Sequence, residues 1–214
     1  MANGIDRDGL VRMLRGAIGE VRAHHEELTR LDSFGGDGDH GTTMLRAAAV
    51  MEKALDASAS PAPGALLGEV GWALMGIDGG ATGPLLGTLF QGMGEAAGDA
   101  TSLDPAGFAA AFAAGLASLG KRTKAKPGDK TMMDALVPAA DAMAAAASSG
   151  EDLPGLLRRA AEAARRGAES TAAMAARFGR AKNVGTKSIG HPDPGATSVS
   201  LILKGLFEGF ESDG

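Results

Sequence analysis

The sequence predicts an all-α protein, and its composition and the spacing of its breaks carry that prediction. Among 214 residues, Tyr and Cys are absent, Trp occurs once and Phe seven times. Ala, Leu, Met and Gly dominate; the first three favour helices, and the β-branched and aromatic residues that favour strands are sparse. Gly, Pro and polar breaks divide the chain into eight segments with mostly short connections. Eight helices joined in this way favour an antiparallel up-and-down bundle or barrel.

The expected helices follow one another with recognisable starts. They cover residues 4–30, 41–58, 64–77, 83–97, 105–122, 131–148, 153–178 and 196–211. The first carries apolar residues close to the 3.6-residue period of a one-faced helix, from Leu10 to Leu28. The second opens after a glycine-rich acidic loop, the third follows the break "ASASPAPG", and the fourth has Pro84 in its first turn.

The later helices are preceded by breaks of the same kind. Asp104 followed by Pro105 is a good N-cap and first-turn pair for the fifth helix, whose apolar residues recur at helical steps from Phe108 to Leu119. The sixth follows "PGDK", the seventh "SSGEDL" and the eighth the proline-stiffened "HPDPG". No break is long enough for a flexible linker and no repeat is visible, so we expect one domain over residues 1–214.

Charge and cysteine content narrow the class of protein. The net charge of −5 gives no basic footprint, so we expect no nucleic-acid partner. The absence of Cys excludes disulfides and thiolate metal sites. The N-terminus is charged throughout, and the alanine-rich runs are broken by Gly and charge well short of a membrane span. These features predict a cytoplasmic protein without a membrane segment.

Alternate connections of an up-and-down bundle lie at the same end, and here they differ in composition. The first, third, fifth and seventh are "LDSFGGDGDH", "GIDGGATG", "TKAKPGDK" and "GRAKNVGTKSIGHPDPG", which hold most of the Gly, Asp, Lys and His. The others, "ASASPAPG", "GDATSLD" and "SSGEDL", are plain connectors. Polar residues gather in loops of any protein, but that tendency does not explain the alternation. The pattern predicts a single active end.

The first of these loops concentrates negative charge. Asp32, Asp37 and Asp39 lie within eight residues, and their repulsion is costly unless a cation compensates or they extend into water. All-oxygen ligands suit Mg²⁺ or Ca²⁺, and the spacing of an EF-hand is missing. Mg²⁺ usually completes its shell with waters and substrate phosphates, which implies a phosphorylated ligand. A solvated acidic turn is the alternative.

Helix starts and glycines in these loops are suited to phosphate. His40 and Gly41 lead into a helix start whose free amides favour anions. The stretch "DGGATGPLLGTLF" could cradle phosphate through backbone amides, or form a tight helix–helix turn. It is no Rossmann fingerprint, because no strand precedes it, and "PGDKT" lacks the spacing of a P-loop.

Two further features involve charged residues. Lys130 lies at a helix start, where a cation is disfavoured unless an anion is near, and Asp129 could cap that helix or support the metal site. The last loop packs cations, His and Asp into about a dozen residues: Arg180, Lys182, Lys187, His191 and Asp193. These cations could hold phosphates or an acidic partner, or form an ordinary basic surface loop.

Four motifs, in this order and spacing, closely resemble one known family. They are "GDGDHG", "GGATGPLLGT", "PGDKTMMDAL" and "GRAKNVGTKSIGHPDPGATS", and they resemble the nucleotide-binding L subunit of bacterial dihydroxyacetone kinase. The same domain forms the C-terminal half of single-chain dihydroxyacetone kinases. The resemblance runs from about residue 5 to 210 and implies an eight-helix antiparallel α-barrel with the nucleotide at one end.

The resemblance also implies site residues. By motif position, the aspartates that hold two Mg²⁺ ions look like Asp32, Asp37 and Asp39. The contacts to ADP or ATP carry over to His40, Gly41, Thr42, Thr43, Ala81, Thr82, Thr123, Met132, Arg180, Asp193, Pro194 and Gly195. Met132 would pack on the adenine. The sequence departs from the family at Gly35, where an aliphatic residue is frequent, and at Asp78, Thr82 and Thr123.

In the family, a partner K subunit holds dihydroxyacetone covalently. We therefore expect this chain to supply donor and metals to a ketose on such a partner, and no general base is evident on it. The donor is either exchanging ATP or a permanently bound ADP that a phosphocarrier of the phosphotransferase system rephosphorylates; the sequence fits both. A subunit for another short ketose such as erythrulose, and a nucleotide-binding regulatory partner of a transcription factor, are the alternatives.

Overall fold

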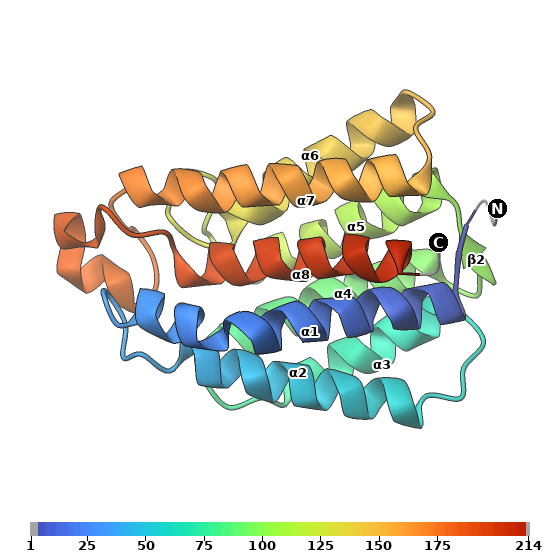
Figure 1. Ribbon diagram of the computed structural model, residues 1–214, viewed down its shortest axis with the longest axis horizontal. Coiled ribbons are helices and arrows are strands. Elements are labelled where there is room, and N and C mark those ends of the chain that lie inside the picture. Colours follow the sequence, from blue (N-terminus) through green and yellow to red (C-terminus); the bar gives the residue numbers. More distant parts are fainter. Residues whose placement is uncertain (1–3, 213–214) are drawn as a thin grey trace.

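The computed structural model describes residues 4–212 and confirms the predicted all-α architecture (Figure 1). Eight α-helices lie in that range: α1 (Arg7–Asp32), α2 (His40–Ala57), α3 (Pro63–Met75), α4 (Thr82–Ala97), α5 (Pro105–Gly120), α6 (Met133–Ser148), α7 (Leu153–Ser170) and α8 (Pro194–Glu211). Two 3-10 segments, η1 (Thr171–Ala173) and η2 (Arg180–Ser188), and two short strands, β1 (Ile5–Asp6) and β2 (Ser102–Leu103), complete the described elements. The outermost residues of the predicted 1–214 domain lie outside this range.

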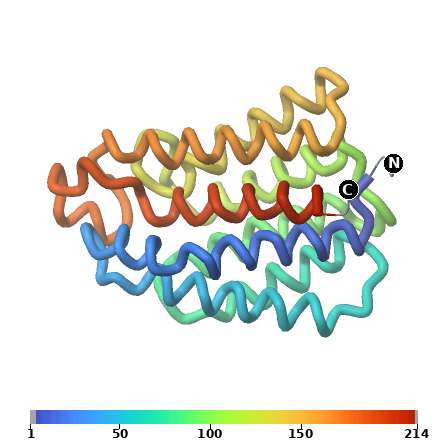
Figure 2. Tube along the Cα trace, viewed as in Figure 1, coloured from blue at the N-terminus to red at the C-terminus, as the bar shows by residue number. Residues whose placement is uncertain are grey.

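The helices form a closed ring. Each helix packs against its neighbours in sequence, and α1 packs against α8, so the first and last helices close the barrel (Figure 1, Figure 2). The interior is filled by apolar side chains from all eight helices, among them Leu14, Met44, Leu66, Phe108 and Leu136. Burial of this apolar surface is the main force that holds the helices together.

Glycines let the closing helices approach one another. At Gly205 of α8, an added side-chain carbon would lie 2.5 Å from the Cα of Ala17 on α1. At Gly209, one turn later, it would lie 2.4 Å from the carbonyl oxygen of Arg12. Both positions therefore require the absence of a side chain, and backbone meets backbone along this seam.

The first helix begins later than the sequence suggests. Residues 4–6 were expected to be helical, but residue 4 is a bend and residues 5 and 6 are extended: β1 pairs antiparallel with β2, with Ile5 opposite Leu103. The Asp6 carboxylate then accepts the amide of Gly9 at 2.8 Å and so caps α1. Buried Ile5 anchors this ladder to the core.

The region after α7 also differs from the prediction. The seventh helix, expected to reach residue 178, ends at Ser170, because the Thr171 carbonyl accepts the Lys130 ammonium and Met174 becomes extended. Residues 180–188, expected as loop, form η2 with a kink at Gly185 (φ 56°). Among the residues described, no helix is long and apolar enough to cross a membrane.

Candidate functional site

One cavity lies at the end of the barrel where α2, α4, α6 and α8 begin. Its volume is about 340 Å³, within the roughly 300–1,000 Å³ of small-molecule sites. All four loops of the predicted active end line it: Asp32 and Asp39 come from the first, Ala81 from the second, Thr123 from the third and Arg180 from the fourth. The alternation of loop composition therefore corresponds to a shared location in the structure.

The acidic loop brings its carboxylates together. Oxygen atoms of Asp32, Asp37 and Asp39 lie within 4.8 Å of one another, close enough to share a cation. The Arg180 guanidinium forms an ion pair with Asp37 and lies 3.7 Å from Asp39 Oδ1, which offsets part of the repulsion. Arg180, predicted to contact nucleotide, therefore contacts two of the predicted metal ligands, Asp37 and Asp39.

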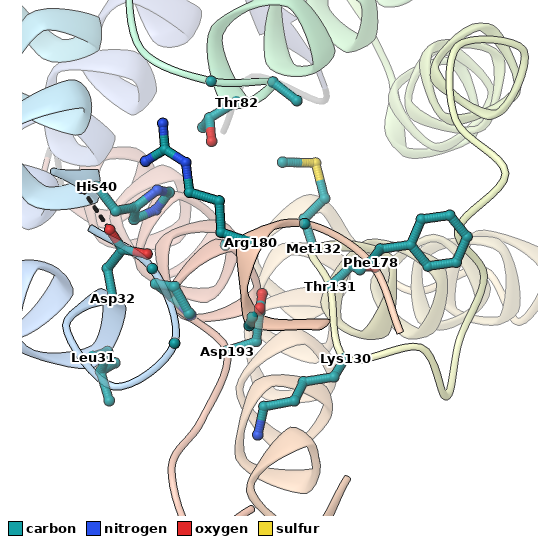
Figure 3. A pocket seen from close by; sticks show the side chains of 18 of the residues that line it. Leu31, Asp32, His40, Thr82, Lys130, Thr131, Met132, Phe178, Arg180 and Asp193 are labelled. Carbon is teal, nitrogen blue, oxygen red and sulfur yellow. Dashed lines mark hydrogen bonds between the residues drawn. The ribbon is translucent and has the colours of Figure 1, made fainter. Parts of the chain in front are cut away.

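Asp32 serves α2 as well as the cluster. Its Oδ2 accepts the backbone amides of Asp39 (3.0 Å) and His40 (3.3 Å), which are otherwise free at the start of α2 (Figure 3). Its Oδ1 lies beside Gly36, where any side-chain carbon would overlap it. Gly36 thus keeps open the space next to an all-oxygen donor set, which is the chemistry that a hard divalent cation prefers.

His40 lines the cavity with a buried, neutral imidazole. Burial lowers the pKa of its imidazole, and the negative charges of Asp32 and Asp39 oppose that shift only in part. Its Nε2 lies 3.2 Å from the Ser198 Oγ of α8, so the ring links the starts of α2 and α8. Such a group can orient a ligand by hydrogen bonding but carries no permanent charge.

The second loop offers unoccupied hydrogen-bonding groups. Gly79 (φ 128°) and Gly80 (φ 67°) have positive φ angles, which glycine tolerates. They lead into Ala81, the N-cap residue of α4, whose side chain accepts no hydrogen bond from the amides at the start of that helix. Across the cavity wall, the buried Oγ1 of Thr43 has no hydrogen-bond partner within residues 4–212. An orphaned hydroxyl and an uncapped helix start facing one cavity fit a phosphate-bearing ligand.

The third loop corrects two sequence expectations. Asp129 neither caps α6 nor joins the acidic cluster: its carboxylate accepts the Lys126 amide at 3.0 Å and pairs with Arg177 at 3.4 Å. Sequence reasoning missed Asp134, whose buried carboxylate accepts the amides of Gly128 (2.6 Å) and Thr131 (2.8 Å). The sequence could have indicated this role, because Asp134 follows Thr131 by three residues, the spacing at which an acidic side chain reaches back to the amide at a helix start.

The Lys130 ammonium is hydrogen-bonded to backbone carbonyls and not to a carboxylate, although the charge of Asp193 lies near it. The ammonium lies within 2.6–3.2 Å of four backbone carbonyl oxygens of residues 171–193. In Figure 3 the Lys130 side chain runs away from Met132 and Thr82. Met132, by contrast, is placed on the cavity wall near the start of α6, as is Thr123, whose Oγ1 accepts the Ala125 amide at 3.1 Å.

The fourth loop, residues 171–193, is called the strap below. Its last residue, Asp193, caps α8 by accepting the Ala196 amide at 2.7 Å, and Pro194 and Gly195 follow on the cavity wall. Burial raises the pKa of Asp193 to about 7, against the Ala196 hydrogen bond and the Lys130 charge, which favour the ionised form. The carboxyl group is thus near its titration point at neutral pH.

The strap also touches the acidic loop in a way that the sequence did not reveal. The rings of Phe34 and His191 stack with centroids 3.5 Å apart and planes within 4°. A side-chain carbon at Gly35 would lie 2.8 Å from Ala181 Cβ, so the two loops meet at that glycine. This contact gives the departure at Gly35 a physical reason.

Two predicted nucleotide contacts do not reach the cavity wall. Gly41 packs on α1, where a side chain would overlap the His25 carbonyl and Thr29, and Thr42 is exposed. In a helix, successive residues point about 100° apart, so His40 and Thr43 face the cavity and the residues between them do not. Any contact from Gly41 or Thr42 would run through the backbone.

The fold and the site define an all-α barrel that gathers carboxylates, an uncapped helix start and a basic strap around one cavity. The DAK2 domain model matches residues 35–208, most of the chain. The chain is 39% identical over 181 residues to the Escherichia coli protein named PEP-dependent dihydroxyacetone kinase, ADP-binding subunit DhaL, covering 85% of this chain and 86% of that protein. It is 38% identical to the L-erythrulose 1-kinase of Mycolicibacterium smegmatis, covering 88% of this chain and 33% of that protein.

The crystal structure of the dihydroxyacetone kinase from C. freundii in complex with AMP-PNP and Mg²⁺ is similar over 93% of this chain, with a TM-score of 0.72 and 27% identity. The chain covers 33% of that kinase, as it does of the erythrulose kinase. The chain belongs to the DAK2 domain family. It is a phosphotransferase of the dihydroxyacetone kinase type.

Proposed function

We propose that residues 1–214 act as one L-type domain, the nucleotide-binding, phosphoryl-donor subunit of a cytoplasmic dihydroxyacetone kinase. The observation that carries this proposal is the cluster of three carboxylates within 4.8 Å, of which Asp32 and Asp39 line the same cavity as an uncapped helix start. The relative from E. coli, which this chain matches over 86% of its length, is named an ADP-binding subunit. The C. freundii kinase was solved with a nucleotide analogue and Mg²⁺.

The carboxylates Asp32, Asp37 and Asp39 are the proposed ligands of two Mg²⁺ ions. Bound Mg²⁺ offsets charge on the transferring and leaving phosphate oxygens. The open Oδ1 of Asp32 and the exposed carboxylates of Asp37 and Asp39 can face such ions without rearranging α2. Arg180 would then release the acids and pair with phosphate instead, because a guanidinium suits either anion.

The remaining wall would hold the nucleotide. The uncapped start of α4 at Ala81 and Thr82, with the Thr43 hydroxyl, would donate to the phosphates. Further proposed contacts are His40, Gly41, Thr42, Thr123, Met132, Asp193, Pro194 and Gly195. Met132 is buried among the wall residues and offers an apolar, polarisable surface to the adenine. Holding donor and metals in fixed geometry is most of what phosphoryl transfer requires.

The acceptor is proposed to be dihydroxyacetone carried by a K-type partner subunit, which would also supply the general base. The likeness to an ADP-binding subunit of a PEP-dependent kinase favours a retained ADP that a phosphocarrier rephosphorylates, over exchanging ATP. The likeness to an L-erythrulose 1-kinase makes a four-carbon ketose the second candidate acceptor.

Retention of nucleotide tests the donor mode. We expect purified protein to keep stoichiometric ADP through extensive dialysis with Mg²⁺, and to lose it with EDTA, as measured by chromatography of the denatured sample. Protein that has been freed of nucleotide with EDTA and then binds no Mg-nucleotide by calorimetry would refute the proposed function. Turnover with a K subunit and each ketose, under ATP or a phosphocarrier, then identifies the acceptor.

Replacement of one ligand tests the metal assignment. Asp37→Asn is expected to reduce turnover by about 10³-fold or more, because charge stabilisation by the metal is lost, while the helical circular dichroism stays unchanged. Asp37 is exposed and receives no backbone hydrogen bond that the structure records, so its loss should not unfold α2. Asp78→Asn, an exposed acid on the next loop, is the matched control. Near-normal turnover in Asp37→Asn would remove the metal assignment.

A further inference from the structure

Lys130 is a buried cation without a carboxylate hydrogen-bonded to it. Its ammonium donates to the carbonyl oxygens of His191 (2.6 Å), Ser188 (2.7 Å), Thr171 (2.9 Å) and Met174 (3.2 Å). The residue is 4% exposed. Four carbonyls around one ammonium form a small cation cage made entirely of backbone.

The four carbonyls belong to the two ends of the strap. Thr171 and Met174 lie where the chain leaves α7, and Ser188 and His191 lie where it returns to α8. The ammonium therefore ties the outgoing and returning segments together at one point. Between these ends, the strap carries Arg180 to the acidic loop.

The cost of placing Lys130 here indicates that the contact matters. Lys130 is the one non-glycine residue with a positive φ (60°) in the described part of the chain, a backbone conformation that is unfavourable for residues with a side chain. Removing an ammonium from water is also unfavourable, and burial lowers the pKa of Lys130. The cage carbonyls and the nearby charge of Asp193 offset these costs.

The strap joins its two ends through two further hydrogen bonds, from the Gly190 amide to the Ala172 carbonyl and from the Asp193 amide to the Thr171 Oγ1, both at 2.8 Å. It turns at Gly179 (φ 66°), Gly185 (φ 56°) and Gly190 (φ 103°), and most residues of η2 are exposed. The Ser188 hydroxyl donates to the Gly185 carbonyl, and its oxygen accepts the Ala176 amide. These bonds lie within the strap, whereas Lys130 and the Arg177–Asp129 ion pair (3.4 Å) link the strap to the loop before α6.

We propose that Lys130 is a positioning residue whose ammonium clamps both ends of the strap and thereby sets where Arg180 and Asp193 stand over the cavity. This role deepens the proposed function, and its predicted effect on nucleotide binding rests on that function. A cage of backbone carbonyls recognises any small cation that donates N–H bonds, so a free ammonium ion can replace the side chain.

Limited trypsin digestion tests the clamp without any nucleotide. In Lys130→Met, we expect cleavage at the strap residues Lys182 and Lys187 to become about ten-fold faster or more, because the strap opens more often. Cleavage at Arg158 and Arg165 of α7 should not change. Lys126→Met, which removes an exposed ammonium from the same loop, is the matched control and should digest like the parent protein. Unchanged strap cleavage, or equal acceleration along the whole chain, would overturn the proposal.

A second variant guards against general misfolding. Lys130→Gly removes the ammonium and also relieves the left-handed strain. Ammonium chloride should slow strap cleavage in this variant toward the parent rate, while tetramethylammonium, which has no N–H donor, should not. Equal effects of the two salts, or no effect of either, would count against the carbonyl cage.

Calorimetry with Mg-ADP separates the two levels of the proposal. After retained nucleotide is removed with EDTA, Lys130→Met should bind Mg-ADP about ten-fold or more weakly than the parent protein treated in the same way, and ammonium should restore affinity in Lys130→Gly. Parent-like affinity in both variants would overturn the positioning role. Failure of the parent protein itself to bind would refute the proposed function, and the digestion pattern would still decide the clamp.

Discussion

Asp32 and Asp193 illustrate how single carboxylates are used twice at this end of the barrel. Asp32 accepts the two amides that start α2 with one oxygen and joins the acidic cluster with the other. Asp193 caps α8 while it faces the cavity and lies near the Lys130 charge. Because capping fixes each side chain, the functional group is held in place by the start of the helix it serves.

The titration of Asp193 leads to a pH prediction. The unfolded chain titrates this group near its ordinary pKa of 3.8 and the folded chain at about 7, so between these values the folded state binds more protons. The contribution of Asp193 to the free energy of unfolding should therefore fall as pH rises from about 4 to about 7.

Asp193→Asn provides the comparison, since it keeps a capping oxygen and does not titrate. Urea unfolding of both proteins across this window should show the parent protein losing stability relative to the variant as pH rises. If the stability of the parent protein relative to the variant stays constant or rises with pH, Asp193 is ionised in the folded protein throughout this window.

At the scale of elements, the acidic loop and the strap act as a pair. Phe34 stacks on His191, Gly35 meets Ala181, and Arg180 reaches the carboxylates. Because these contacts follow one another along both segments, a shift of the strap would move the carboxylates that we propose as metal ligands.

Gly35 is predicted to set the distance between these two segments. Gly35→Ala would place a carbon 2.8 Å from Ala181 Cβ, and the strap must move to relieve it. We expect Mg-ADP affinity, measured by calorimetry, to fall about three- to ten-fold. The double variant with Ala181→Gly should recover most of that loss. Independent, additive effects of the two substitutions would argue against direct contact.

The strap was also where the sequence-based expectations were least accurate. The alanine-rich run of α7 continues in sequence past Ser170, so periodicity predicted a helix to residue 178. The structure ends it at Thr171, whose carbonyl belongs to the Lys130 cage. That interaction joins residues 41 positions apart, so the helical periodicity around residue 171 cannot indicate it.

At the scale of the whole molecule, stability depends on closure of the ring between α1 and α8. The seam relies on Gly205 and its neighbours, where backbones touch. Gly205→Ala is expected to lower the free energy of unfolding by about 1–3 kcal/mol, because overpacking outweighs the gain in helix propensity. Chemical denaturation measures this change.

Gly19→Ala, on the same helix pair, is the control. Nothing lies within 4 Å of an added carbon there, so stability should be unchanged or rise by about 0.5–1 kcal/mol. If both substitutions destabilise equally, the seam does not depend on close approach. Mg-ADP affinity should be retained in both variants, since the seam lies away from the strap.

The sequence by itself determined the eight helices, the gathering of four polar loops at one end, and the family. Helical periodicity and breaks are local properties, and loop alternation follows from antiparallel order. Only the tertiary structure decided that Lys130 faces carbonyls, that Arg180 pairs with the acids, and why Gly35 has no side chain. These three features depend on contacts between segments more than 40 residues apart. Tertiary packing determines which distant segments meet, and local sequence preference does not, so the sequence alone could not predict these contacts.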